Sequence, residues 1–298
     1  MAAAAGVLRA QGTGTASPGQ PGAPGPAAGR RPVLQGIGLA LLLLGGFLLG
    51  FAGYLHFLSG RQEARSQFTL YQRLGIELGG QVAPLGATAP GAPVAILNIP
   101  AIGLRNEVIV AGTSPENLML GPGHRLDTPL PGQAGVSQVY GRRATFGAPF
   151  GAVPQLRRGD VIRVTTGQGI STYSVVATGG SARLIENPAP NQLLLVTAGS
   201  DVVPRYYFSV DADLISPVKA GPAGLPAVYS DETALSSDSG ALVLALLWGL
   251  ALVIVSTAGT AAAARWSPWL AYLATAPVAL AVLWNLYQSL AALLPNIY

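Results

Sequence analysis

Few side chains in this sequence have the chemistry of a nucleophile or of a general base. The chain has no cysteine and two histidines, His56 and His124. Two hydroxyl residues, Thr197 and Ser200, stand at the end of a strongly apolar run. A hydroxyl attacks a carbonyl only when a neighbouring base takes its proton. The residue types therefore allow one dyad, Ser200 with His124, provided that the fold brings the two together.

The composition removes several other kinds of chemistry. Without cysteine, disulfides, thiolate metal sites and thiol redox reactions are all excluded. No glycine-rich loop that would hold a phosphate follows a strand pattern. The net charge is +4, and basic and acidic residues nearly cancel between residues 94 and 218 without forming a basic stripe with aromatics. We therefore expect no metal, no cofactor and no nucleic-acid partner.

Three long stretches carry no charged residue: 33–58, 240–264 and 267–298. Each is longer than the ~20 residues that cross the hydrocarbon core of a bilayer. Half of the chain is apolar and 10% is charged, which is too apolar for an ordinary soluble protein. We interpret the stretches as transmembrane helices, the third covering residues 267–293.

The loop between the second and third spans indicates the orientation. It carries Arg265, and short loops with basic residues tend to stay in the cytoplasm. Arginines flank the first span on both sides, so they do not orient it. With the loop inside, residues 59–239 face outward from a multi-pass plasma-membrane protein. Residues 1–32 form a cytoplasmic leader, which we expect to be disordered because it has too few apolar residues to bury.

Two polar residues stand out within the third span. Asn285 and Gln288 lie three positions apart, on one face of the expected helix. Polar side chains inside a membrane usually face protein rather than lipid. They could pair with the other two spans or dock another membrane protein.

The middle of the chain, residues 94–218, has a different pattern of short β-type runs separated by glycine- and proline-containing turns. This spacing favours a closed or sandwiched all-β domain. The expected strands are 95–99, 107–111, 135–140, 161–165, 171–177, 193–197 and 206–214. A stalk and linker, 59–93, precedes the domain, and a polar linker, 219–239, follows it.

Seven motifs in this domain follow one another in the order and at the separations typical of sortases. They occupy residues 97–104, 121–124, 128–132, 141–143, 146–150, 159–162 and 195–198. The domain therefore resembles a sortase, with features of the class E-like, actinobacterial members. The resemblance implies a closed β-barrel of about eight strands with short helices, joined here to three transmembrane helices.

The resemblance also implies a catalytic site that this chain has lost. Sortases are extracytoplasmic transpeptidases that use a cysteine nucleophile, a histidine and an arginine. Ala198 stands at the cysteine position and Arg142 at the histidine position, while Arg205 or Tyr207 stands at the arginine position. An alanine methyl group cannot hold an acyl group, and a guanidinium keeps its proton at physiological pH.

We therefore expect a catalytically inactive sortase-like protein that binds or scaffolds a cell-surface protein or a sorting-signal-like peptide. The expected ligand groove is lined by Arg142, Thr197, Ala198 and Arg205. One alternative is an active transpeptidase or acyltransferase with a hydroxyl nucleophile, Ser200 or Thr197. Another is a structural subunit of a membrane complex, in which the three helices supply the interface.

Overall fold

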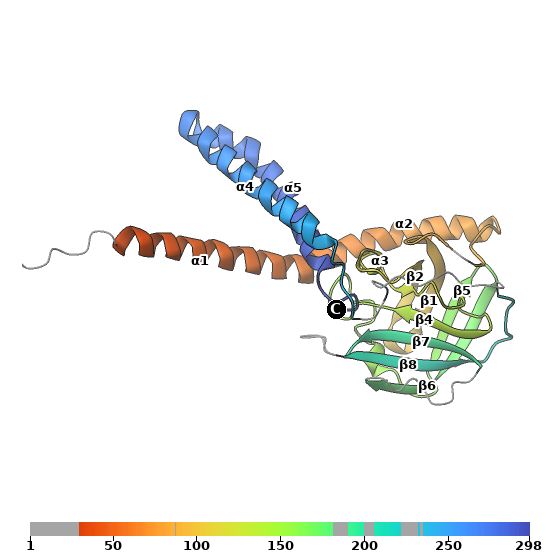
Figure 1. Cartoon of the computed structure of the whole chain (residues 1–298). Helices are drawn as coiled ribbons and strands as arrows, with labels where there is room; N and C mark the ends of the chain where they lie inside the picture. Colours follow the sequence, from red (N-terminus) through yellow and green to blue (C-terminus); the bar gives the residue numbers. More distant parts are fainter. Residues whose placement is uncertain (1–29, 87, 181–189, 200–205, 222–231, 233–234) are drawn as a thin grey trace, which may run out of the picture. The chain divides into compact units, whose positions relative to one another are not determined.

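The computed structural model describes residues 30–86, 88–180, 190–199, 206–221, 232 and 235–298. Residues 1–29, most of the expected leader, lie outside the described residues, as do Ser200 and Arg205. The chain divides into two compact units, Met1–Leu48 and Leu49–Tyr298. The second unit contains the whole β-domain and the last two long helices (Figure 1).

The β-domain is a closed barrel with the strand order β1-β2-β3-β4-β7-β8-β6-β5, which confirms the expected fold class (Figure 1). In its described part the strands are β1 (Pro93–Ile99), β2 (Leu104–Ala111), β3 (Gly123–His124), β4 (Gly135–Tyr140), β5 (Val161–Thr166), β6 (Gly169–Gly180), β7 (Asn191–Ala198) and β8 (Tyr207–Leu214). Seven of them correspond to the seven expected runs. The two-residue strand β3 is additional, because two residues are too short to show a period.

Barrel closure depends on two parallel pairs among otherwise antiparallel neighbours. Strand β2 pairs in parallel with β3, and β4 pairs in parallel with β7. Alternate residues of β7 then face opposite sides of the wall. Leu193 and Leu195 belong to the barrel core, whereas Leu194 and Val196 belong to a separate cluster on the other side.

Short helical segments connect the strands. The one-turn helix α3 (Pro115–Leu118) follows β2, and two 3-10 turns, η2 (Pro100–Ile102) and η3 (Val153–Gln155), precede β2 and β5. Ser114 is extended before α3, and Pro115 occupies its first position, where the missing N–H costs no hydrogen bond.

Within the described residues, three helices are long and apolar enough to cross a membrane. The first begins as α1 (Arg30–Gly53) and continues through a π-helical segment, η1 (Tyr54–Leu58), into α2 (Ser59–Gly79). The other two are α4 (Ala241–Arg265) and α5 (Pro268–Ala292), which pack against each other. The Asp238 N–H donates to the Ala292 carbonyl, so the start of α4 lies beside the end of α5.

The segment expected as a stalk after the first span contains the helix α2, which lies against the barrel. Gln67 bridges the two: its amide nitrogen donates to the Val108 and Leu120 carbonyls at 3.0 and 2.9 Å, and its amide oxygen accepts the Val108 N–H at 2.7 Å. Leu74 packs beside it on Val108. This segment therefore covers one side of the barrel wall.

Candidate functional site

The expected site lies where β7 ends between β4 and β8. Register places Ala198 opposite Tyr207 of β8 and Val196 opposite Tyr140 of β4. Beyond the ladder the Arg143 guanidinium donates to the Ala198 carbonyl at 2.8 Å. The pairing of β4 with β7 thus brings residues 140–143 next to residue 198.

Gly141 stands at a position that has no room for a side chain. A Cβ added to this residue would overlap the ring of Phe150. Its N–H donates to the Val196 carbonyl at 2.9 Å and extends the contact between β4 and β7 by one residue. The glycine therefore allows the aromatic ring to pack directly on the backbone that positions Arg142.

Ala198 is completely buried on the outer side of the barrel wall. It belongs to an apolar cluster with Leu118 of α3, Tyr140 of β4 and Ile297, with Tyr207 packed against it. Solvent does not reach the Ala198 methyl group, and the methyl has no nucleophilic atom. Packed side chains therefore surround the Ala198 methyl group.

Arg142 is also completely buried, which is unusual for an arginine. Its guanidinium donates to the Leu118 carbonyl at 3.2 Å, the Pro115 carbonyl at 3.2 Å and the Thr145 hydroxyl at 3.3 Å. It also lies 4.9 Å from the centre of the Phe146 ring, a cation–π contact. The side chain holds α3 and the loop after β4 together.

Burial lowers the pKa of Arg142 to about 9, because water no longer solvates the charge. At neutral pH the guanidinium remains protonated. It therefore cannot take a proton from a nucleophile, and its donors are directed at oxygens of the protein itself.

Thr197 and Ala198 face opposite sides of the barrel wall, because side chains alternate along a strand. The Thr197 hydroxyl is buried and donates to the Gly141 carbonyl at 2.9 Å. In the described part of the chain the hydroxyl is thus bonded to a main-chain carbonyl, which is not a general base. Of the two residues expected at the arginine position, Tyr207 lies opposite Ala198 and Arg205 falls outside the described residues.

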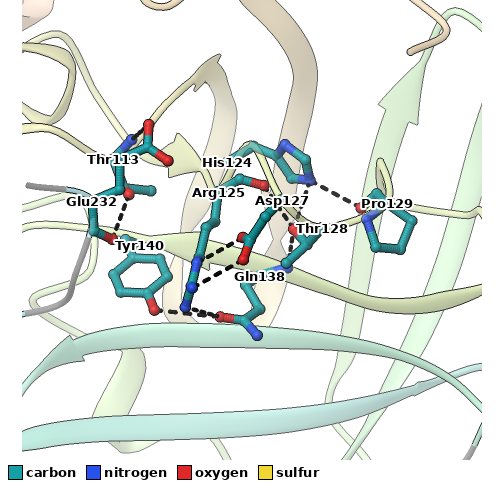
Figure 2. A network of polar contacts seen from close by, with 9 residues as sticks. All are labelled: Thr113, His124, Arg125, Asp127, Thr128, Pro129, Gln138, Tyr140 and Glu232. Carbon is teal, nitrogen blue, oxygen red and sulfur yellow. Dashed lines mark hydrogen bonds and ion pairs between the residues drawn. The ribbon is translucent and has the colours of Figure 1, made fainter. Parts of the chain in front are cut away.

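His124 lies in β3, inside a network of polar contacts that Figure 2 shows from close by. Its Nε2 is 2.9 Å from the Pro129 carbonyl and 3.2 Å from the Thr128 hydroxyl. A carbonyl can only accept, so Nε2 carries the hydrogen. Burial lowers the pKa of His124 to about 4, which makes it a neutral structural residue at pH 7.

Beside His124 is an ion pair that the sequence analysis did not identify (Figure 2). The Arg125 guanidinium makes two contacts with the Asp127 carboxylate, at 2.7 and 3.0 Å. It reaches the Gln138 side-chain oxygen at 3.4 Å, and the Tyr140 hydroxyl donates to the same oxygen at 3.3 Å. The network fixes the turn between β3 and β4 and links it to the Ala198 cluster through Tyr140.

A second set that the sequence did not indicate is a pair of carboxyl groups, Glu63 of α2 and Glu107 of β2. They line a cavity of about 210 Å³ together with residues 147–149 and 152. Burial raises the pKa of Glu107 to about 7, and a hydrogen bond from Glu63 opposes that rise. Residues 44 positions apart in sequence give no pattern from which such a pairing could be predicted.

The third unexpected feature is the segment after α5, which lies on the Ala198 cluster. Ile297 is completely buried there, and the Arg143 N–H donates to its carbonyl at 3.1 Å. The apolar run 267–298 suggests a membrane span, and Pro295 indicates where a helix ends. Nothing in that pattern indicates where the chain goes afterwards.

Comparison with known proteins identifies relatives of the barrel. Residues 97–204 match the family model described as Sortase domain. No curated protein sequence matches the chain. Sortase E from Streptomyces avermitilis is 31% identical over 43% of this chain and 91% of its own, with a TM-score of 0.38. Sortase E1 from Streptomyces coelicolor, solved with a tripeptide in its active site, is 22% identical over 44% and 92%, with a TM-score of 0.39.

The buried neutral state of His124 predicts a specific acid sensitivity. Its pKa is lower in the folded chain than the ordinary 6.5, so its contribution to stability is present above pH 6.5 and is lost as pH falls towards 4. The full linkage is about 3 kcal/mol. Thermal unfolding is measured for His124→Gln and for the wild-type protein at pH 7 and pH 4.5. The decrease in unfolding temperature between the two pH values should be smaller in the variant. Equal losses would contradict the assignment.

Proposed function

Because the chain belongs to the sortase family, we propose that it is a non-catalytic, membrane-anchored member that binds or scaffolds a cell-surface protein. Three helices of sufficient length and apolar composition support the membrane anchor. We expect the barrel to lie on the extracytoplasmic side of the membrane. What distinguishes the chain from a transpeptidase is its site.

The pair Ala198 and Arg142 carries this proposal. Acyl transfer requires a nucleophile that bonds to the carbonyl carbon and a group that accepts and returns a proton. The Ala198 methyl offers no nucleophile and is covered by other side chains. Arg142 keeps its proton at neutral pH and donates to three protein oxygens. Both changes act against the same reaction, which favours binding or scaffolding over catalysis.

A peptide assay tests the absence of catalysis. Purified full-length protein, a quenched fluorescent sorting-signal peptide and an amine acceptor should give turnover at least about 1000-fold below that of an active sortase run in parallel. Ala198→Cys alone should not restore turnover, because Arg142 supplies no base. An acylating probe attached to Thr197 or Ser200, located by mass spectrometry and lost in Thr197→Val with Ser200→Ala, would refute the proposal.

The arrangement of α4 and α5 supports an outward-facing barrel. Asn296, after α5, donates to the Thr113 carbonyl of the barrel at 3.1 Å, and the start of α4 lies beside the end of α5. Two helices that both span the bilayer then place the loop with Arg265 on the opposite side from the barrel. Basic loops favour the cytoplasm, so we assign the barrel to the cell surface.

Substituted cysteines test this sidedness without interference, since the chain has no cysteine of its own. Ile170→Cys places a thiol at an exposed site on β6, and Trp266→Cys places one in the loop between α4 and α5. A membrane-impermeant maleimide should label position 170 in intact cells and position 266 only after permeabilisation. The reverse pattern would mean an inward-facing barrel.

A cavity beside the membrane helices favours a second role, as a subunit of a membrane assembly. It measures about 390 Å³ and is lined by Asn285 and Gln288 of α5, by Glu116 and Asp238, and by apolar residues of α4. Asn285 donates to the Ala281 carbonyl of its own helix, which leaves its amide oxygen for another donor. A membrane helix with a hydrogen-bonding side chain near its outer end fits this lining.

Substitution of the two amides separates this role from binding by the barrel. Asn285→Leu with Gln288→Leu should reduce crosslinking to a membrane partner in native membranes at least about fivefold, since interhelical hydrogen bonds contribute on the order of 1 kcal/mol. Ser256→Leu, on an exposed part of α4, is the matched control and should leave crosslinking unchanged. If the double variant crosslinks like the control, the cavity is not the docking site.

A further inference from the structure

Residues 296–298 leave the end of α5 and lie on the barrel instead of extending into solvent. Asn296 and Ile297 each have an exposed fraction of 0%. Complete burial of two consecutive residues is unusual for a segment that follows a membrane helix, where chain ends and connections are normally at the surface. The segment is therefore held by specific contacts with the barrel.

Polar contacts hold the main chain of this segment. The Arg143 N–H donates to the Ile297 carbonyl at 3.1 Å, and the Thr145 hydroxyl donates to the Tyr298 carbonyl oxygen at 2.6 Å. The Asn296 side chain donates to the Thr113 carbonyl at 3.1 Å and to the Ser236 hydroxyl at 3.0 Å. Main-chain hydrogen bonds with one anchoring side chain are typical of a bound peptide.

Apolar contacts explain why the cluster accepts this segment. Ile297 belongs to the same buried cluster as Ala198, Leu118 and Tyr140. A cysteine at position 198 would add a sulfur atom to a cluster that has no exposed surface at Ala198 or Ile297. Packed clusters do not take extra atoms without a shift of their neighbours. The small side chain of Ala198 is therefore what leaves room for the isoleucine.

Arg142 supports the same segment through Thr145. The guanidinium donates to the Thr145 hydroxyl oxygen at 3.3 Å, and that hydroxyl donates in turn to Tyr298. A hydroxyl can accept and donate at once, so the arginine orients the Thr145 hydrogen towards the segment. Both replaced catalytic positions therefore contribute to one structure: Ala198 makes room for Ile297, and Arg142 orients the donor to Tyr298.

We propose that the former catalytic site is a peptide-binding site occupied in cis by residues 296–298 of this chain. Its ligand chemistry is a turn, closed by the Tyr298 N–H that donates to the Pro295 carbonyl at 3.0 Å, with a side-chain amide followed by a β-branched aliphatic residue. This inference rests on the proposed loss of catalysis. It adds that residues 296–298 occupy the place where a substrate peptide would bind. The segment fastens the end of α5 to the barrel, and any other peptide reaches the site only after displacing it.

A buried thiol in the segment tests the occupancy in the full-length protein. Ile297→Cys introduces the only cysteine of the chain as a small apolar residue, and Ile170→Cys is an exposed reference. Local opening limits the labelling of a buried thiol, so a maleimide in mild detergent should modify position 297 about 100-fold more slowly than position 170. Equal rates would overturn the proposal.

Bulk at position 198 tests the specific contact. Ala198→Leu, added to Ile297→Cys, should expel the segment and speed labelling at least about 10-fold, because the cluster is already full. Ala101→Leu, at an exposed site in η2, is the matched control and should leave the rate unchanged. If Ala198→Leu does not accelerate labelling, Ile297 does not occupy this site.

Dilution decides whether the segment comes from the same molecule. Protection of the Ile297→Cys thiol should not change over about 100-fold dilution, since binding in cis does not depend on concentration. Loss of protection on dilution would assign the segment to a second copy and overturn the proposal. The peptide assay remains independent: turnover by the unchanged chain would refute the loss of catalysis, whereas rapid labelling would refute only the occupancy.

Discussion

Strands β4 and β7 run in parallel, and their register decides which side chains meet at the end of the barrel. Six residue pairs, from Gly135 with Asn191 to Tyr140 with Val196, align the two strands. A shift by one residue would turn every β7 side chain to the other face of the wall. Ala198 would then point into the core, and Thr197 would face α3. The site exists because this register is held from both sides, by β3 and by β8.

A buried guanidinium is the second constraint. Removing a charge from water is costly, and the cost is offset only when hydrogen bonds satisfy the group. Arg142 has three oxygen acceptors and an aromatic ring around it. The same contacts tie α3 and the loop after β4 into one unit. The residue that we propose to stand at the position of the catalytic histidine is therefore part of the structural support of the barrel end.

Much of the fold was predictable because it depends on local patterns. Strands such as β5 alternate buried and exposed residues, and the uncharged runs are long enough to span a bilayer. The assignment of Ala198 and Arg142 to catalytic positions rests on ordered motifs and stays a prediction. Their surroundings were not predictable: Arg142 was expected to line a groove, and it is buried under α3. Glu107 pairs with Glu63, and Ile297 packs on Ala198, through contacts between distant segments.

The sequence by itself determined which atoms are present: no thiol anywhere, an alanine and an arginine at the positions where the resemblance leads us to expect a cysteine and a histidine, and three apolar runs. Residue type sets nucleophilicity, charge and hydropathy, so these conclusions need no coordinates. Only the tertiary structure decided that Ala198 is buried and that Ile297 lies in the same cluster. Contacts in the folded chain join segments about 100 residues apart, and no local sequence pattern indicates a contact over that separation.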